Sequence, residues 1–428
     1  MPQATHDYRL SVRIVSEHEL ANLLGSLTQA TPRVIISGNF ATPLRAVGIL
    51  DATVETYRLF TLNAQESIPS RPDVVHETAF VGPGMRHSPR LDYLPMRLSL
   101  VPRLFATTRP PDLVIVHTST PRAGKVSLGI EVNILPAAIE QARARGGLVI
   151  AQLNPNMPYT LGDAEIDSEM IDLAIEVEEE LASPTDHEPD DRTAQIAEQV
   201  ASLGCDGATL QLGIGQVPDA TLSRLGRRHK GLRVWSEMAS DGVLALERAG
   251  ALDGGRPITA SFLIGSAELY EWADANPRLL LRRTETTNDP ARIASNPAML
   301  SINTALQIDL FAQANASYVR GRIYSGFGGQ PDFVVGALHS NGGHAVIALP
   351  AWHDKTSSST LVPLLDVPAG SFQHSVVVTE QGCAYVFGRS QRGQARLLIE
   401  ETADPRAREE LWEAATLLGI TDRRGENA

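Results

Sequence analysis

The 428-residue sequence has little cysteine, few aromatic residues and no long hydrophobic run. Its two cysteines, Cys205 and Cys383, can form no disulfide framework and do not have the spacing of metal ligands. We therefore expect a reducing compartment and no metal site. No apolar run approaches the ~20 residues that span a bilayer, and the first residues lack the basic and apolar regions of a signal peptide. Together these absences predict a cytoplasmic protein without a membrane segment.

Positive charge is also in the minority. The 37 Lys and Arg residues face 50 Asp and Glu residues, which gives a formal net charge of −13. This balance argues against nucleic acid or an anionic membrane as a partner. A phosphate-bearing ligand would have to be held locally, against the net field. The 43% hydrophobic content is ordinary for a globular protein, and the length favours two domains.

Short apolar runs alternate with amphipathic segments, which is typical of an α/β protein with mostly parallel sheets. The expected strands cover residues 33–37, 113–117, 148–152, 209–212, 232–235, 258–262, 345–349 and 375–379. The expected helices cover residues 17–27, 134–145, 193–203, 219–225 and 405–418. The last helix is expected to begin at Pro405, with Asp404 as its N-cap.

One acidic, proline-containing stretch, residues 176–192, interrupts this alternation. We interpret it as a solvated connector rather than a regulatory segment, and we expect one domain over residues 1–185 and a second over residues 186–428. Two patterns recur in the same order in both halves: a strand that ends at a glycine with a proline five residues later, and a Gly-Gly pair before a strand. The repetition predicts duplicated α/β domains with a site in the cleft between them.

A carboxylate at the end of an apolar run, Glu237, stands between two glycine-rich loops. The first loop, residues 213–218, could present helix amides to an anion, although a tight structural turn explains such a loop more often. The second, residues 325–333, has three glycines within four positions, so that its backbone could direct amides at a developing oxyanion; a flexible turn is the alternative. Alone, Glu237 would be interpreted as a solvated side chain. Beside two such loops, it could attack an activated acyl carbon, as in a thioester.

Other common active-site motifs are missing. Pro218 replaces the third glycine of a dinucleotide fingerprint, and the sequence has no phosphate-binding loop of the G-x-x-x-x-G-K type. It has neither a G-x-S-x-G nucleophile elbow nor an H-E-x-x-H zinc motif. The sequence therefore favours neither a serine hydrolase nor a metalloenzyme.

The two loops, Glu237 and further motifs make the chain similar to the acetyl-CoA hydrolase/transferase family, close to 4-hydroxybutyrate and acetate CoA-transferases. The motifs that carry this resemblance lie at residues 38–43, 77–82, 127–129, 154–158, 161–163, 213–215, 236–242, 301–307, 326–333 and 379–382. Each motif is weak alone, but their order is specific, and they span nearly the whole chain.

The resemblance implies two tandem CoA-transferase-type (NagB/RpiA-like) α/β domains, with mostly parallel sheets and the active site in the cleft between them. It implies a homodimer and a ping-pong reaction, in which Glu237 is the nucleophile that carries CoA from an acyl-CoA to a carboxylic acid as a glutamyl-CoA thioester. CoA is then a substrate, and no tightly bound cofactor is expected. The CoA contacts that the resemblance implies are Gly213, Ile214, Gly215, Gln216, Val217, Gly326, Gly328, Gly329 and Asn341.

Four positions at which family members often carry a cation are neutral here: Tyr159, Val335, Asn341 and Thr360. Their neutrality allows a more hydrophobic or aromatic acyl group, or reduced activity. Two alternatives to a CoA-transferase remain at the sequence level. One is an acyl-CoA hydrolase that uses the same glutamate with water as acceptor, and the other is a non-catalytic CoA or metabolite sensor. The presence of Glu237 and both loops favours an enzyme.

Overall fold

The computed structural model describes residues 12–184, 190–213 and 216–420. The chain divides into two compact units, residues 1–184 with 259–286 and residues 185–258 with 287–428. The division at residue 184 falls beside the expected boundary at residues 185/186. Residues 259–286, which the sequence assigned to the second domain, belong to the first unit.

The segment 259–286 joins the first unit through backbone pairing. The Leu263 N–H donates to the carbonyl of Ile130, and the Thr284 N–H donates to that of Asn133, both at 2.9 Å. Its strand β17 (Leu279–Leu281) also pairs in parallel with β9 (Leu161–Gly162). Hydrogen bonds between residues so far apart in sequence leave no local pattern from which the assignment could have been made.

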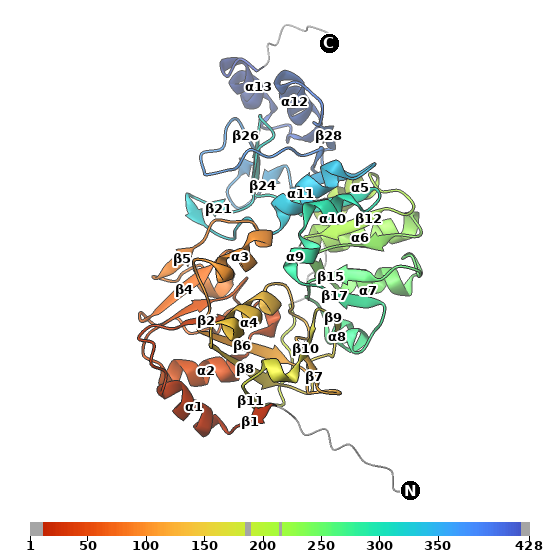
Figure 1. The fold of residues 1–428 in the computed structure, drawn as a ribbon. Helices are drawn as coiled ribbons and strands as arrows, with labels where there is room; N and C mark the ends of the chain where they lie inside the picture. Colours follow the sequence, from red (N-terminus) through yellow and green to blue (C-terminus); the bar gives the residue numbers. More distant parts are fainter. Residues whose placement is uncertain (1–11, 185–189, 214–215, 421–428) are drawn as a thin grey trace. The chain divides into compact units, whose positions relative to one another are not determined.

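The first unit contains an eight-stranded sheet in which every pair of neighbouring strands is parallel. Its order is β1 (Arg13–Ile14), β11 (Leu173–Glu176), β8 (Leu148–Leu153), β6 (Leu113–Thr118), β2 (Arg33–Ile36), β3 (Tyr57–Phe60), β4 (Val74–Thr78) and β5 (Leu91–Tyr93). These strands are coloured red to yellow in Figure 1. Every residue of β6 is buried, as expected for a parallel strand that is covered on both faces.

Helices and small strands complete the first unit. They are α1 (Glu17–Gly25), α2 (Leu44–Thr53), α3 (Val101–Ala106), α4 (Leu135–Ala144), α8 (Ala267–Ala273), the antiparallel pair β7 (Lys125–Ser127) and β10 (Glu165–Asp167), and β15 (Ile258–Ala260), which joins β17 and β9 in a three-stranded sheet. The Ser16 hydroxyl accepts a hydrogen bond from the Glu19 N–H, which is the usual way for serine to begin a helix.

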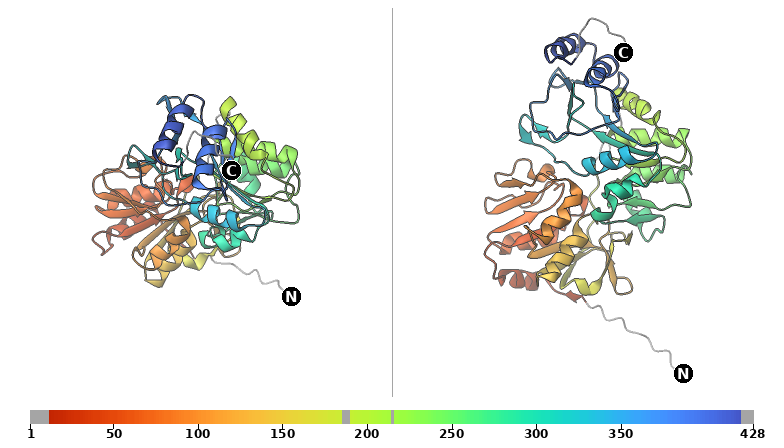
Figure 2. Two further views of the ribbon diagram at one scale, coloured as in Figure 1. Left: turned by 90° about the horizontal axis from the view of Figure 1, so that it is seen from above. Right: turned by 45° about the horizontal axis from the view of Figure 1, so that its top comes forward.

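The second unit contains a six-stranded sheet that is parallel except for its last strand. Its order is β13 (Arg233–Val234), β12 (Thr209–Leu212), β18 (Met299–Thr304), β23 (His344–Ala348), β27 (Val376–Val378) and β28 (Cys383–Tyr385). Its helices are α5 (Asp191–Ala201), α6 (Gln216–Arg228), α7 (Asp241–Arg248), α10 (Pro290–Ala294), α11 (Gln330–His339), α12 (Gln391–Leu397) and α13 (Arg408–Leu417). Helices α5, α6 and α7 lie side by side (Figure 2).

Short strands surround this second sheet. β19 (Gln307–Asp309) pairs with β20 (Ala314–Asn315) and β26 (Leu361–Val362), β21 (Tyr318–Val319) pairs with β22 (Arg322–Ile323), and β24 (Trp352–His353) pairs with β25 (Ser358–Ser359). The remaining strands and α-helix are β14 (Met238–Ala239), β16 (Phe262–Leu263) and α9 (Thr284–Thr287). Among the described residues, no helix is both long enough and apolar enough to cross a bilayer.

The expected α/β class with mostly parallel sheets is confirmed, and the two sheets share one strand order. The series β3–β2–β6–β8–β11 in the first unit corresponds to β13–β12–β18–β23–β27 in the second. Both Gly-Gly pairs precede equivalent strands, β8 and β23. The first glycine of each pair, Gly146 or Gly342, has a φ of +74° or +72°. A side chain on the second, Gly147 or Gly343, would meet the carbonyl of a preceding helix. The repeated sequence patterns therefore mark a repeated topology.

Two expected features differ from the structure. The last helix begins at Arg408 rather than Pro405, because the Asp404 carboxylate accepts the Arg406 N–H at 2.9 Å and its carbonyl accepts the Ala407 N–H. Asp404 therefore caps a turn that precedes the helix. The connector is also less free than expected, because Asn154 donates a hydrogen bond to the Glu179 carbonyl at 2.8 Å.

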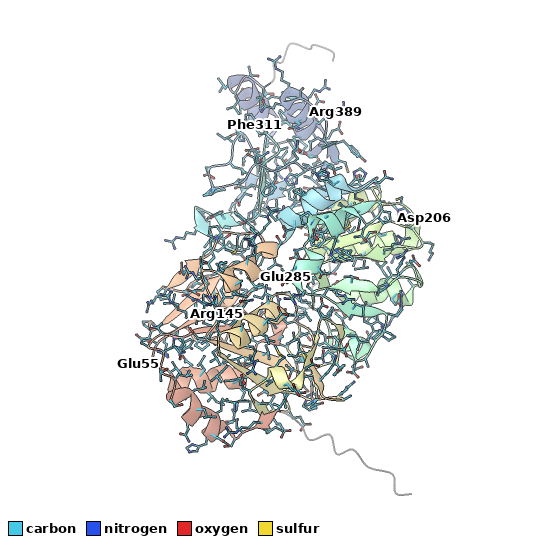
Figure 3. All side chains as sticks on the ribbon, viewed as in Figure 1. Glu55, Arg145, Asp206, Glu285, Phe311 and Arg389 are labelled. Carbon is cyan, nitrogen blue, oxygen red and sulfur yellow. The ribbon has the colours of Figure 1, made fainter. Side chains whose placement is uncertain are left out.

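Charged side chains lie mostly on the outside of each unit. Figure 3 labels Glu55, Arg145, Asp206 and Arg389, all of which are exposed.

Candidate active site

Glu237 lies just beyond the carboxyl end of β13, and its neighbours fasten it to the next strand of the sheet. The Ser236 hydroxyl accepts the Leu212 N–H at 3.2 Å, and the Trp235 N–H donates to the Leu210 carbonyl. Leu212 is the last residue of β12, directly before Gly213. The segment that carries Glu237 is therefore tied to the strand that leads into the first glycine loop.

An asparagine holds the carboxyl group. The Asn288 Nδ2 donates to Glu237 Oε1 at 3.0 Å, and Asn288 is fully buried. Its Oδ1 accepts the Thr287 hydroxyl, which orients the amide so that the NH₂ group faces Glu237. The Trp235 indole donates to the Thr287 carbonyl at 3.0 Å and so fixes the backbone next to Asn288.

The second glycine loop touches the same carboxyl. A Cβ atom at Gly329 would lie 2.3 Å from Glu237 Cδ and 2.3 Å from Asn288 Nδ2, so only glycine fits there. The Gly329 backbone N–H hydrogen-bonds to the Glu237 carboxyl, and α11 begins at the next residue. Amides at a helix N-terminus favour negative charge.

Burial raises the pKa of Glu237 to about 7. The Asn288 amide and the Gly329 backbone lower it, whereas the nearby Asp332 carboxylate raises it. The carboxyl is thus more basic than an ordinary glutamate and still ionises near neutral pH. Perturbed carboxyls of this kind concentrate at functional sites.

The rest of the second loop is anchored rather than a free surface turn. The Gly326 carbonyl accepts the Ser317 hydroxyl at 2.9 Å, and Ser325 donates to the Ala316 carbonyl at 2.8 Å. Gly328 has a φ of +55°, which favours glycine. The loop is therefore held in the conformation that places Gly329 against Glu237.

The first loop is only partly described. Ile214 and Gly215 lie outside the described residues, and so does the side chain of Gln216. Among the described residues, a Cβ atom at Gly213 would meet only the Ile302 carbonyl, at 3.5 Å, which is an ordinary contact. The packing against these residues would thus tolerate a side chain at position 213 and does not by itself require glycine. Space for a ligand is therefore one reason for a glycine here. Val217 is half-buried in the first turn of α6.

The structure does not bring Asn341 to this group. It is exposed in the turn after α11, and the ten residues of α11 span about 15 Å from Gly329. Of the other neutral positions, Thr360 is buried and donates to the Pro350 carbonyl at 2.6 Å, and Val335 is half-buried on α11. In the first unit, the Tyr159 hydroxyl donates to Glu165 at 3.2 Å.

Sequence reasoning missed a buried carboxyl in the first unit. Glu131 accepts hydrogen bonds from Asn39 Nδ2 at 2.6 Å and from Asn133 Nδ2 at 3.0 Å, and Asn63 Nδ2 donates to Asn39 Oδ1 at 2.8 Å. Burial raises the pKa of Glu131 to about 8. Asn63 follows β3 by three residues, as Glu237 follows β13. The first unit thus has an amide where the second has its carboxyl.

No signal in the sequence identifies Asn288 or Glu131. Asn288 precedes an ordinary helix start, Asp289-Pro290, and Glu131 is separated by about 90 residues from the Asn39 that binds it. Only the fold brings these groups together. Among the described residues, no cluster of three His, Cys, Asp or Glu side chains could hold a metal ion.

Known proteins of similar sequence include CoA-transferases and acetyl-CoA hydrolases. The model of the acetyl-CoA hydrolase/transferase C-terminal domain matches residues 265–415. The 4-hydroxybutyrate coenzyme A transferase of Clostridium kluyveri is 38% identical over 351 residues, which cover 78% of this chain and 80% of the relative.

Solved structures agree. The 4-hydroxybutyrate CoA-transferase of Porphyromonas gingivalis superposes with a TM-score of 0.80 at 31% identity, over 95% of this chain and 98% of the other. RipA of Yersinia pestis superposes with a TM-score of 0.88 at 26% identity, over 96% of this chain and 98% of the other. These matches place the fold in the CoA-transferase class. More narrowly, the chain belongs to the acetyl-CoA hydrolase/transferase family.

Proposed function

We propose that this protein transfers CoA from an acyl-CoA to a free carboxylic acid, with Glu237 as the nucleophile. The observation that carries the proposal is the convergence of three groups: the Glu237 carboxyl, the Asn288 amide and the Gly329 backbone N–H. A carboxyl held between two N–H donors, with a pKa near neutrality, suits reversible acyl transfer.

The first half-reaction begins when a Glu237 oxygen attacks the acyl-CoA carbonyl carbon. A C–O bond forms, the C–S bond breaks, and CoA leaves as the thiolate. The product is an anhydride between the acyl group and Glu237. The CoA thiolate then attacks the glutamyl carbonyl, the original acid leaves as a carboxylate, and Glu237 is left as a thioester of CoA.

The second half-reaction reverses these steps with the acceptor acid. Its carboxylate attacks the glutamyl carbonyl of the thioester, and the CoA thiolate leaves, which gives a new anhydride. The thiolate then attacks the acceptor carbonyl of that anhydride, so that the acceptor becomes a CoA ester and Glu237 is regenerated as a carboxylate. No water, oxidant or metal is consumed. The chemistry therefore needs only a nucleophilic carboxyl and donors for the oxygen that becomes negative in each tetrahedral intermediate.

When the glutamyl carbonyl is attacked, the oxygen that becomes negative belongs to Glu237. Asn288 and Gly329 are the proposed hydrogen-bond donors for this oxygen. Both already bind the carboxyl, so they need no rearrangement when charge develops. The absence of a side chain at Gly329 leaves the space that the Glu237 carboxyl occupies. CoA itself is proposed to lie along the backbone of residues 213–217 and of the loop at residues 326–329.

Water in place of the acceptor acid would make the same glutamate a hydrolase, an activity that the family description also contains. The homodimer, the cytoplasmic location and a site that faces the other domain, all expected from the sequence, stay predictions. The acyl and acceptor groups are addressed in the next subsection.

The proposal is tested with acyl-CoA and no acceptor, which should convert Glu237 to a thioester with the mass of CoA less one water. Borohydride should then reduce that thioester and inactivate the enzyme. Glu237→Gln should lower turnover by several orders of magnitude while the protein stays folded. A label on another residue, or an active Gln variant, would refute the role of Glu237. Release of free CoA at full rate without acceptor would identify a hydrolase instead, and CoA binding without any adduct would identify a sensor.

A further inference from the structure

A small cavity in the second unit shares a wall with the loop that contacts Glu237. Its volume is about 40 Å³, room for roughly three water molecules or the last few atoms of an acyl chain. Phe327, Pro331, Val334 and Phe372 give it an apolar lining. It is thus too small for a whole ligand but suits one end of a ligand.

The wall of the cavity is fixed in place. The Phe372 N–H donates to Gln313 Oε1 at 2.9 Å, and Gln313 Nε2 donates back to the Phe372 carbonyl at 3.1 Å. Ser317, another lining residue, donates from its hydroxyl to the Gly326 carbonyl at 2.9 Å. The cavity is therefore part of the fold.

One polar side chain in this lining has no partner. His374 is 3% exposed, and neither of its ring nitrogens has a hydrogen-bond partner among the described residues. An unsatisfied buried polar group is costly and rare. Burial lowers the pKa of His374 to about 4, so that the ring is neutral at physiological pH, with one N–H donor and one acceptor nitrogen.

The cavity lies beside the glycine that contacts the proposed nucleophile. Phe327 and Gln330 line it, and Gly329, which lies between them, contacts the Glu237 carboxyl. Successive Cα atoms are 3.8 Å apart, so both lining residues start within about 8 Å of that glycine. A four-carbon acyl group extends about 4 to 5 Å from its carbonyl carbon to its last carbon. The short chain separation between this lining and Gly329 is compatible with an acyl group whose carbonyl lies at Glu237 and whose far end lies in the cavity.

We propose that this cavity is the subsite for the far end of the acyl group, and that His374 selects an end that is uncharged and forms hydrogen bonds. The inference rests on the proposed function of Glu237 and adds a specificity residue to it. A terminal hydroxyl can donate to or accept from either ring nitrogen. A terminal methyl leaves His374 unsatisfied. A terminal carboxylate would be buried against a neutral ring without a counter-charge, which is strongly unfavourable.

Three CoA esters of equal chain length separate these cases: 4-hydroxybutyryl-CoA, butyryl-CoA and succinyl-CoA. The wild-type enzyme should prefer them in that order by kcat/KM. In His374→Phe, which keeps a ring of similar size without nitrogens, the preference for the hydroxyl over the methyl ester should fall by about 10- to 100-fold. The exposed His339 at the end of α11 provides the matched control, His339→Phe, for which the ratio should not change.

Two further measurements keep the test decisive. His374→Phe removes two unpartnered buried nitrogens, so its midpoint of thermal unfolding should rise, which excludes misfolding as the cause of altered specificity. Dissociation constants of the same esters, measured in the Glu237→Gln background, report the subsite without turnover. A wild type that transfers no CoA would refute the proposed function but leave this binding ratio to decide the inference. An unchanged ratio of 4-hydroxybutyryl-CoA to butyryl-CoA affinity on removal of His374 would overturn it.

Discussion

At the scale of single residues, the environment of a carboxyl decides its chemistry. Glu237 and Glu131 each accept hydrogen bonds from asparagine amides, and burial raises the pKa of both. Glu77, also buried, has a lowered pKa because arginines surround it. Three glutamates of one chain thus have three different acidities, and each supports a separate prediction.

The pH dependence of catalysis should follow the ionisation of Glu237. The pKa of about 7 means that the nucleophilic carboxylate is the minor form below neutrality. We expect kcat/KM for an acyl-CoA to rise about tenfold per pH unit below pH 6 and to become constant above pH 8. A profile that is flat between pH 5 and 8 would contradict this assignment. Initial rates in a constant-ionic-strength buffer series provide the measurement.

Gly329→Ala should abolish most activity for a steric reason alone. The new methyl group would lie 2.3 Å from the Glu237 carboxyl, whereas the backbone φ of −92° suits alanine. We expect a loss of at least 100-fold in kcat with an intact fold. The matched control is Gly48→Ala on helix α2, where no atom lies within 4 Å, and its activity should be unchanged. Equal activity of the two variants would show that Glu237 is not confined by the loop.

Two residues of the candidate site could be proposed from the sequence, and two others could not. Gly329 and Glu237 belong to local motifs, and motifs are visible in a linear sequence. Asn288 and His374 have no motif; one acts through a hydrogen bond to a residue 51 positions away, and the other is notable only for the partners it lacks. Such residues become visible when the three-dimensional neighbours are known.

At the scale of elements, a buried carboxylate joins neighbouring strands of the first sheet. Glu77 on β4 is fully buried and pairs with Arg33 on β2 at 2.7 Å, with Arg58 on β3 at 3.1 Å and with Arg109. Although burial raises the pKa of Glu77, the hydrogen bonds and charges of these arginines lower it below its usual value. The stabilisation is therefore present at neutral pH and is lost as pH falls through that lowered pKa.

Removal of this carboxylate should destabilise the first unit. Glu77→Ala leaves three guanidinium groups without their shared partner, and we expect a loss of about 3 kcal/mol in the free energy of unfolding. The control is Asp92→Ala, which removes a partly exposed partner of Arg109 and should cost less than 1 kcal/mol. Urea unfolding followed by circular dichroism measures both. Similar values for the two variants would contradict the central role of Glu77.

Element prediction from the sequence succeeded where apolar runs are continuous. Strands such as β6 and β8 consist of buried apolar residues along most of their length. β4 and β18 were not expected, because His76 and Glu77 in the former and Ser301 and Asn303 in the latter interrupt the pattern. These polar residues are buried, and the fold provides distant partners for Glu77 and Ser301, which bond to Arg33 and Gln211 on other strands.

At the scale of the whole molecule, Glu131 should affect how stability depends on pH. Its pKa rises from 4.5 to about 8 in the native state. Between these values the native protein retains a proton that the unfolded chain has lost, so stability falls as pH rises. Glu131→Gln should reduce this slope by up to about 1.4 kcal/mol per pH unit, as measured by urea unfolding between pH 5 and 9. The exposed Glu66→Gln controls for the loss of one charge, and an equal slope in all three proteins would exclude this effect.

The duplication was also predictable at this scale, because turn glycines occupy equivalent positions in both halves. The assignment of residues 259–286 to the first unit could not be predicted. The second half of the sequence contains no signal that this segment pairs with β9 and with residues near Glu131. A contiguous boundary was the natural expectation for a duplicated chain. The structure instead interrupts the second unit with a piece of the first.

That interruption governs the order in which the protein can be made. A ribosome that has released residue 184 has not yet synthesised β17, and the first unit must wait for about another 100 residues, or 5 to 20 s of translation. By then the first strands of the second unit have also emerged, so that two unfinished sheets coexist on the nascent chain. A gene fragment that ends at residue 185 should therefore yield an incomplete first unit, whereas one that extends to residue 286 carries every strand that this unit contains.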